Sequence, residues 1–438
     1  MYEMAQKALS LAMKNGADEA EVYYANNRST SANIRKNLIE GAKEQFSEGI
    51  GIRAIIGGAV GFASTNIPNR LEDAVKIAVA SARVRESDPD WTGLVSNSKY
   101  PNVSGIFDKR IVAMELDECI ELALQMIEGA RSAPELNILA TSGSFSRSYG
   151  KHLILNSNGV EVEEEGTATS GFIDVITTTG ETSTAYDFAV SRNHDIDFYQ
   201  IGVNAAKLAQ ESQNGISIEP HKTDVILHPF AFADIIESAF APSIDADNVQ
   251  KGRSSLIGRL GDEIAASELT IIDDGLMPGG IETGISDDEG VPSQRTSVIE
   301  NGVFKSYLYD SYTAGKDGVK STGNAARQSY VSTPSVGLRN FIIEYPQSDI
   351  ISGTDSGVFV NTVIGAHTAN AISGDFSVEA RNAYTIKGGQ IDKPIKSLMI
   401  SGNIFEMLAN ITGAGMDVRK VGGTVTPSIR VSDMSVIG

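Results

Sequence analysis

The segment Asp273-Asp274-Gly275, followed by Asp287-Asp-Glu-Gly-Val-Pro292 and Asn301-Gly302-Val303, sets the character of the second half of this chain. Each piece joins short apolar runs through Asp, Asn, Gly or Pro, the residues that tight turns use most. Glycine continues to punctuate the sequence in this way as far as Arg430. The pattern predicts many short strands joined by hairpins.

Upstream of this segment, helices and groups of strands follow one another. A helix is predicted over Phe230–Phe240, after a short buried strand at Asp224–His228. Helical periodicity predicts further helices over 2–15, 71–85, 116–130 and 198–213. Alternating polar and apolar residues predict strands at 21–25, 31–36, 40–47, 51–56 and 59–63, then from 136 to 191, with turns at Gly57-Gly58 and Gly180-Glu181.

Helices beside runs of hairpin strands indicate an α+β fold rather than a doubly wound parallel sheet. The chain has 438 residues, more than one compact core usually holds. We expect an N-terminal α+β region with an antiparallel sheet over 1–220, with a sub-boundary near residue 110, and a β-rich domain with few helices over 221–438.

Charge and composition limit the classes of function. The formal net charge is −20, which argues against nucleic acid as a partner because such binding rests on Lys and Arg contacts to phosphates. The single cysteine, Cys119, lies among leucines at helical spacing and is expected to be a buried hydrophobic residue. With no export signal over 1–16 and no apolar run of membrane-spanning length, we expect a soluble cytoplasmic protein that does not enter membranes.

The histidines do not form a recognisable zinc motif. The chain has five, and the nearest pair, His221 and His228, is seven residues apart, which places them on opposite faces of a strand. The acidic groups Asp273-Asp274 and Asp287–Glu289, with Glu282, could bind a hard cation through oxygen ligands. Turns in which Asp side chains cap the neighbouring backbone are the favoured interpretation.

Several motifs in the second half resemble the TldD/PmbA family when taken in order. They are Gly258-Arg-Leu-Gly-Asp262, Asp273-Asp274-Gly275, Asp287-Asp-Glu-Gly-Val-Pro292, Val298-Ile-Glu-Asn-Gly302, Tyr309-Asp-Ser-Tyr-Thr-Ala314, Ser321-Thr-Gly-Asn-Ala-Ala-Arg327, Gly374-Asp-Phe-Ser377, Pro394-Ile395 and Ser401-Gly-Asn403. In the metallopeptidase subunit of that family, the helix just upstream of the Asp-Asp-Gly segment carries a His-Glu-x-x-x-His metal site. The corresponding helix here contains Phe232, Asp234 and Glu237 but no histidine, which is typical of the PmbA-type (TldE-type) subunit.

This resemblance implies a non-catalytic subunit without its own metal. The expected partner is a metal-bearing TldD-like paralogue in a heterodimer that degrades peptides, with zinc in the partner only and a homodimer as the alternative assembly. Asp234 and Glu237, one turn apart, are expected to share a face in a solvated or capping role. The residues expected to face a partner or a peptide are Asp287, Asp288, Glu289, Gly374, Asp375 and Phe376.

Two other functions stay open at this stage. One is an independent hydrolase that uses atypical ligands or no metal, so the sequence does not decide whether the chain is an enzyme by itself. The other is a binding protein that modulates a target such as DNA gyrase, as an older name of the family suggests. No catalytic residue is assigned to this chain.

Overall fold

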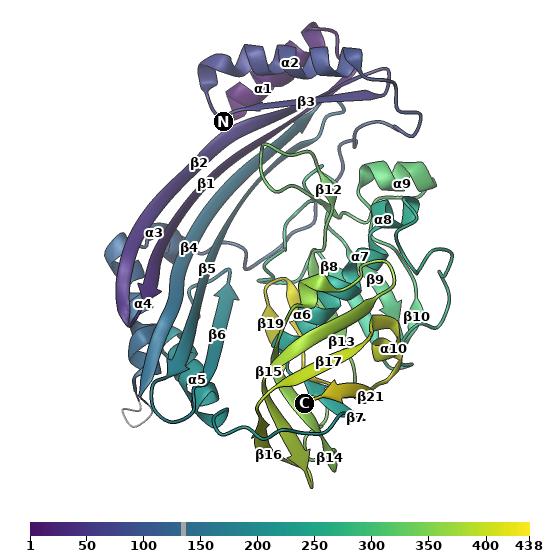
Figure 1. Cartoon of the computed structure of the whole chain (residues 1–438). Coiled ribbons are helices and arrows are strands. Elements are labelled where there is room, and N and C mark those ends of the chain that lie inside the picture. The colour runs from purple at the N-terminus through teal and green to yellow at the C-terminus, as the bar shows by residue number, and fades with distance from the viewer. Residues whose placement is uncertain (133–136) are drawn as a thin grey trace.

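The computed structural model describes residues 1–132 and 137–438. Six strands of the first half form one antiparallel sheet in the order β3-β2-β1-β4-β5-β6. The sheet arches around the rest of the molecule, with the second half of the chain inside the curve (Figure 1). The elements of this N-terminal unit are α1 Tyr2–Lys14, β1 Glu19–Arg35, β2 Leu38–Ile56, β3 Ala59–Thr65, η1 Pro68–Arg70, α2 Leu71–Val84, α3 Lys109–Ala113, α4 Leu116–Ala130, β4 Ile138–Asn156, β5 Glu161–Thr177, β6 Thr184–Ser191 and α5 Phe198–Glu211.

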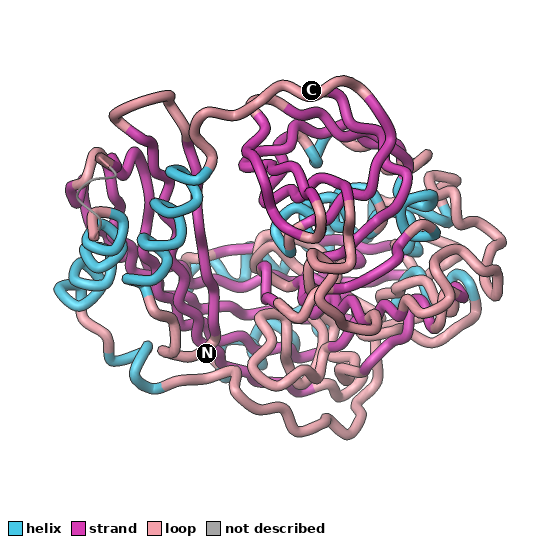
Figure 2. Tube along the Cα trace, turned by 90° about the horizontal axis from the view of Figure 1, so that it is seen from below, coloured by secondary structure: helices cyan, strands magenta, loops and turns pink. Residues whose placement is uncertain are grey.

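The helices of the N-terminal unit cover one face of the sheet at its two ends. Alternate residues of β1, among them Val22 and Tyr24, pack with α1 and α2, and Ala32 and Ile34 pack with α4 and α5. Residues of the opposite parity, such as Tyr23, pack toward the C-terminal unit. Seen from below, the helices lie beside the sheet on the side away from the C-terminal unit (Figure 2). The sheet therefore has an outer face with helices and an inner face turned toward the second half of the chain.

The long strands correct part of the sequence prediction. The segments expected at 21–25 and 31–36 are one strand, β1, and those expected at 40–47 and 51–56 are one strand, β2. Their middles read as breaks because they are polar, yet β1 pairs with β2 and β4 through this stretch. β3 pairs only with residues 50–56 of β2, so residues 38–49 form an edge with no strand partner on that side in the described parts of the chain.

The C-terminal unit places one helix between two sheets. Helix α6, Pro229–Ala239, buries Phe232, Ile235 and Ile236 in a core shared with residues of both sheets. One sheet has the order β14-β7-β21-β17-β15-β16, with β18 paired to β21, and the other has the order β10-β9-β8-β13-β20-β19. The family-typical glycine-punctuated segments become the short strands and turns of these sheets. The α+β fold with a strand-rich C-terminal region is confirmed.

The remaining elements of this unit are mostly short strands. They are β7 His221–Leu227, α7 Ala241–Ile244, α8 Ala246–Gln250, β8 Thr270–Asp274, β9 Arg295–Glu300, β10 Val303–Phe304, α9 Ser311–Asp317, β11 Ala325–Ala326, β12 Ser335–Val336, β13 Asn340–Glu344, β14 Ser356–Ile364, η3 Ala366–Thr368, β15 Asp375–Lys387, β16 Gln390–Ile395, β17 Leu398–Asn403, α10 Ile404–Ala409, β18 Ile411–Ala414, β19 Arg419–Val421, β20 Thr424–Thr426 and β21 Ile429–Ile437. Within the described ranges, no helix is both long and apolar enough to cross a membrane.

Candidate functional site

The face of α6 that is not packed in the core carries two carboxylates, Asp234 and Glu237. Glu237 is exposed, and its Oε1 accepts a hydrogen bond from the Thr424 hydroxyl of β20. Asp234 is partly buried, and burial together with the nearby charge of Glu237 raises its pKa to about 6. The two acids therefore act on one another across one helical turn, as their spacing predicts. Of the expected solvated or capping role, capping does not apply to Asp234, which lies in the middle of α6, and Glu237 is solvated.

Aromatic residues from both units meet beside this carboxylate pair. Phe230 at the start of α6 stacks on Phe188 and Tyr186 of β6, with ring centroids 4.7 and 5.8 Å apart. The Arg419 guanidinium lies over the Phe230 ring at 4.3 Å and donates to Asp187 Oδ1 at 2.6 Å. This contact joins the edge strand of the arched sheet to α6, so the carboxylates lie next to the junction of the two units.

His228 lies between β7 and α6, at the N-cap position of α6. Its Nδ1 accepts a hydrogen bond from Phe230 N at 3.3 Å, so the ring caps the helix. Burial, and then the charge of Arg419, lower the pKa of His228 to about 4. The imidazole is thus neutral at neutral pH and serves the helix start. Among the residues that the structure describes, no group of three or more His, Cys, Asp or Glu side chains could hold a metal ion.

The loop Asp287–Pro292 lies against the inner face of the sheet. Asp287 is 1% exposed and accepts hydrogen bonds from the backbone N–H groups of Glu289, Val291 and Ala325. Burial and the charge of Glu289 raise the pKa of Asp287. The turn interpretation of this acidic segment fits these bonds, since the carboxylate closes its own loop.

The neighbouring acids bind residues of the N-terminal unit. Glu289 is 0% exposed, and its Oε1 lies 3.0 Å from Arg53 Nη2, which also lies 2.8 Å from Glu21 Oε2. Asp288 accepts from Tyr23 Oη at 3.3 Å and from Arg327 N at 2.7 Å. Burial opposes ionisation of Glu289, but Arg53 and the Ser311 N–H outweigh it and lower its pKa. In this structure, therefore, Asp287 and Glu289 lie inside the molecule, where Glu289 helps to join its two halves.

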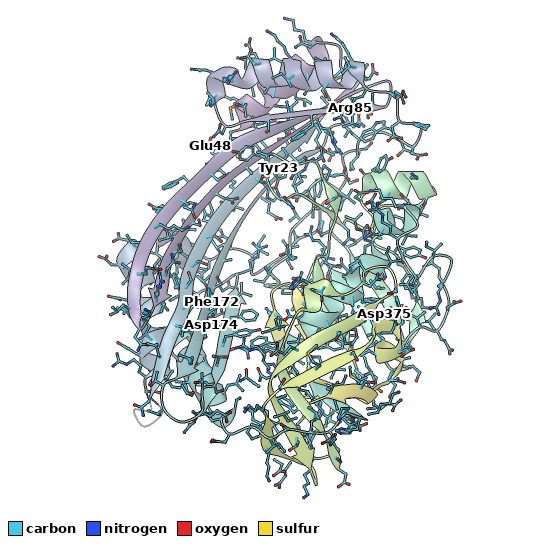
Figure 3. The ribbon with its side chains drawn as sticks, viewed as in Figure 1. Tyr23, Glu48, Arg85, Phe172, Asp174 and Asp375 are labelled. Carbon is cyan, nitrogen blue, oxygen red and sulfur yellow. The ribbon has the colours of Figure 1, made fainter. Side chains whose placement is uncertain are left out.

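The second group of predicted residues lies far from that loop, at the start of β15. Asp375 is exposed and bonded to Asn403 and Ser373, whereas Gly374 and Phe376 are buried beside α10. Figure 3 shows Asp375 on the C-terminal unit, away from Tyr23 and Arg85 at the upper end of the arched sheet and from Phe172 and Asp174 at its lower end. The structure does not bring the two predicted groups together.

Sequence reasoning missed the cations of the junction. Arg53 stands in the apolar run Gly49–Ile56 and Glu21 in the predicted strand 21–25. A charged residue inside an apolar strand is rarely buried without a partner, and this signal could have identified both. Arg327, which pairs with Glu21 and lies 4.9 Å from the Tyr23 ring, is 306 residues away from Glu21, so nothing local indicates the contact.

This geometry defines a class of α+β protein. One arched antiparallel sheet curves around a second unit, in which a helix packs between two sheets. The chain matches models of PmbA/TldA metallopeptidase domain 1 over 20–82, the central domain over 109–213 and the C-terminal domain over 220–438. The protein belongs to the PmbA/TldD family.

Named relatives and solved structures agree with this assignment. An uncharacterised protein of Methanocaldococcus jannaschii is 35% identical over 97% of both chains, and the metalloprotease PmbA homologue of Haemophilus influenzae is 26% identical over 98% of this chain and 94% of that one. TldE from Thermococcus kodakarensis superposes with a TM-score of 0.93 at 26% identity, covering 99% of this chain and 100% of that one. A proposed modulator of a DNA gyrase from Thermotoga maritima has a TM-score of 0.92 at 26% identity, covering 99% of both chains.

Proposed function

We propose that this protein is the non-metal-binding subunit of a two-chain metallopeptidase that acts on peptides or unfolded segments in the cytoplasm. The observation that carries the proposal is α6, whose free face presents Asp234 and Glu237 and no histidine. Without imidazole ligands at this helix, the chain has no zinc ion there to activate a water molecule. The metal and the catalytic base are then supplied by a TldD-like paralogue.

Two features support a role with that paralogue. Relatives of both named types align with almost the whole chain: the PmbA homologue of Haemophilus influenzae over 98% and the TldD homologue over 90%. Two chains of one architecture can assemble through equivalent surfaces, as symmetric dimers do. We propose exposed Asp375, with Gly374 and Phe376 beneath it, as contacts of the partner chain.

The inner face of the arched sheet supports the handling of extended peptides. Its lower part carries Phe172, which is 41% exposed, and hydroxyl groups of Ser146 and Ser170 at 2.8 Å from one another. An extended peptide can contact such side chains or add to a free strand edge, of which residues 38–49 of β2 provide one. In this proposal the chain guides peptide toward the partner's metal.

The experiment compares the chain alone with a mixture. Zinc content and cleavage of a quenched fluorescent peptide library are measured on the purified chain, on the paralogue from the same organism that carries His-Glu-x-x-x-His, and on both together. We expect the chain alone to be metal-free and inactive, and the co-eluting mixture to cleave. A mixture containing a paralogue whose motif glutamate is replaced by glutamine is the matched control. Stoichiometric zinc together with cleavage by the single chain would contradict the proposal and establish an independent hydrolase.

A second candidate function follows from the similarity to the proposed DNA gyrase modulator. In that function the chain binds a protein target and needs no peptidase partner. The direct test is a supercoiling assay with purified gyrase in the presence of this chain alone. A concentration-dependent change in supercoiling, together with co-elution of the two proteins, would support it, and no change at micromolar concentration would eliminate it.

A further inference from the structure

A cavity of about 370 Å³ lies where the two units meet. Its N-terminal wall comes from Arg53 on β2, Val60 on β3, and Arg85 and Trp91 after α2. Its C-terminal wall includes Asp245 before α8, Asp310 before α9, and the segment 333–336. Volumes of about 300–1,000 Å³ are typical of small-molecule sites, which often form between domains. Figure 3 labels Arg85 at the upper end of the sheet, beyond Tyr23, where this cavity lies.

Arg53 lines this cavity, and one of its side-chain donors has no partner. Its Nη2 binds Glu21 and Glu289, but its Nε has no hydrogen-bond partner although the residue is only 5% exposed. A buried donor without an acceptor loses its hydrogen bonds to water without replacement, so such groups are rare in folded proteins.

Arg85 adds an unpaired cation to the same wall. One of its Nη atoms donates to Val60 O at 2.9 Å, and the guanidinium forms no ion pair with any described residue. Carboxylates bind guanidinium groups through short charge-assisted hydrogen bonds. The N-terminal wall therefore offers a carboxylate two guanidinium groups.

The opposite wall carries an excess of acid: besides Asp247 and Lys251, which pair with each other at 2.6 Å, it contains Asp245 and Asp310. Neither Asp245 nor Asp310 forms an ion pair within the described residues. Asp310 receives both hydrogen bonds of Thr313 on Oδ1, which leaves Oδ2 for another donor. The two acids are neighbours because the segment around Leu308 pairs with Asp245. Burial raises the pKa of Asp245 to about 6, as expected for acids without a countercharge.

We propose that this cavity binds a small zwitterion with a free ammonium and a free carboxylate, either a free amino acid or a short peptide. The carboxylate lies toward Arg53 and Arg85, and the ammonium lies toward Asp245 and Asp310. Trp91, held by its Nε1 bond to Glu19 at 2.9 Å, forms an aromatic wall. A purely anionic ligand would face the two acids, and a purely cationic ligand would face the two guanidinium groups. The site does not depend on the pairing with a metal-bearing partner.

The test is binding to the full chain, measured by thermal shift and then by calorimetry. The probes are the twenty free amino acids and dipeptides of alanine with each residue at either position, which separate the two ligand sources. We expect saturable binding by at least one of them, lost when the amino group is acetylated or the carboxylate is converted to an amide. Because both ends are required, each capped probe should bind about tenfold more weakly or worse.

Two variants connect binding to the cavity. Asp310→Asn keeps an N-cap residue, and Arg85→Gln changes an exposed side chain, so both should fold. Each is expected to weaken binding about tenfold or more, whereas Arg70→Gln, an exposed arginine outside the cavity, should bind as the parent does. Absence of binding by every probe, or unchanged binding by Asp310→Asn and Arg85→Gln, would overturn the proposal. Neither result bears on whether the chain pairs with a peptidase.

Discussion

Arg53 is the residue on which the two halves of the molecule converge. Burial disfavours its charge, but the coulombic attraction and hydrogen bonds of Glu21 and Glu289 outweigh this and raise its pKa. Such a buried network is stable only when each charge has its partner. The same residue lines the 370 Å³ cavity, which is why it also enters the ligand proposal.

Asp234 should make stability depend on pH. Its pKa is about 6 in the folded state, above the ordinary 3.8. Between these two pH values the carboxyl is therefore protonated in the folded protein and ionised in the unfolded chain. The ionised carboxylate therefore lowers stability above about pH 6, and this cost disappears as the pH falls toward about 4. Asp234→Asn is expected to raise the free energy of unfolding at pH 7 by about 1 kcal/mol, allowing for solvent screening.

Urea denaturation at pH 7, above the folded-state pKa of about 6, and at pH 4.5, below it, measures this difference. The gain from Asp234→Asn should shrink at the lower pH. The control is Asp262→Asn, which removes a surface carboxylate paired with Arg259 at 3.1 Å. This variant should change the free energy of unfolding by less than about 0.5 kcal/mol. If Asp234→Asn gave no gain in the free energy of unfolding at pH 7, or the same change at both pH values, the ionised carboxylate would not destabilise the folded state.

At the scale of elements, helix α4 could be predicted to its end residues and the long strands could not. The buried residues of α4 recur at helical spacing, so the sequence pattern alone predicts the helix; they include Cys119, Leu122, Ala123 and Met126. The middle of β1 carries Asn26 to Ser31, polar residues that lie between the two helix pairs covering the ends of the sheet. Local alternation cannot reveal a strand whose partners and covering helices lie elsewhere in the chain.

Helices α4 and α5 approach each other through glycine. A Cβ at Gly202 would lie 2.0 Å from Met126 O, and one at Gly129 would lie 2.0 Å from Tyr199 O. Gly202→Ala must therefore push the helices apart, and we expect a loss of about 1–3 kcal/mol or more in the free energy of unfolding. Gly41→Ala, at an exposed strand position with no atom within 4 Å of the added carbon, is the matched control and should be nearly neutral. Equal stability of the two variants by urea titration would contradict this packing.

The candidate site was only partly predictable, because some of its features are local in the sequence and others depend on contacts between distant segments. The absence of histidine from α6 and the turn chemistry of Asp287 are local, and sequence reasoning found both. The burial of Glu289 depends on Arg53, 236 residues away, so exposure could not be inferred from its acidic neighbours. Contacts between distant segments decide which members of an acidic cluster meet solvent.

For the whole molecule, Trp91 reports on the junction of the units. It is the only tryptophan, bonds to Glu19, and lies 5.6 Å from the Arg53 guanidinium. Arg53→Met leaves Glu289 buried without its cation and should destabilise the junction by about 3–5 kcal/mol. Because the cores of the two units are separate, the urea midpoint of Trp91 fluorescence should fall more than the midpoint of far-UV circular dichroism.

The exposed arginine variant Arg70→Gln is the control for that experiment. The free energy of unfolding from either signal should stay within about 0.5 kcal/mol of the parent value. Identical shifts of both signals in Arg53→Met would show that the chain unfolds as one cooperative body. In that case the ion cluster contributes to the stability of the whole chain rather than to docking of one half on the other.

The open edge of β2 also bears on how the protein behaves in concentrated solution. Unpaired strand edges are templates for fibre growth, and natural proteins often protect them with charge. Glu44 and Glu48 stand on one face of this edge, on either side of Phe46, which is 70% exposed and covered by Arg28 at 5.4 Å. Two copies aligned edge to edge would bring these acids close together, and Arg28 and Arg147 offset part of the charge of Glu44. We therefore expect Glu48 to contribute most of the charge that opposes edge-to-edge association.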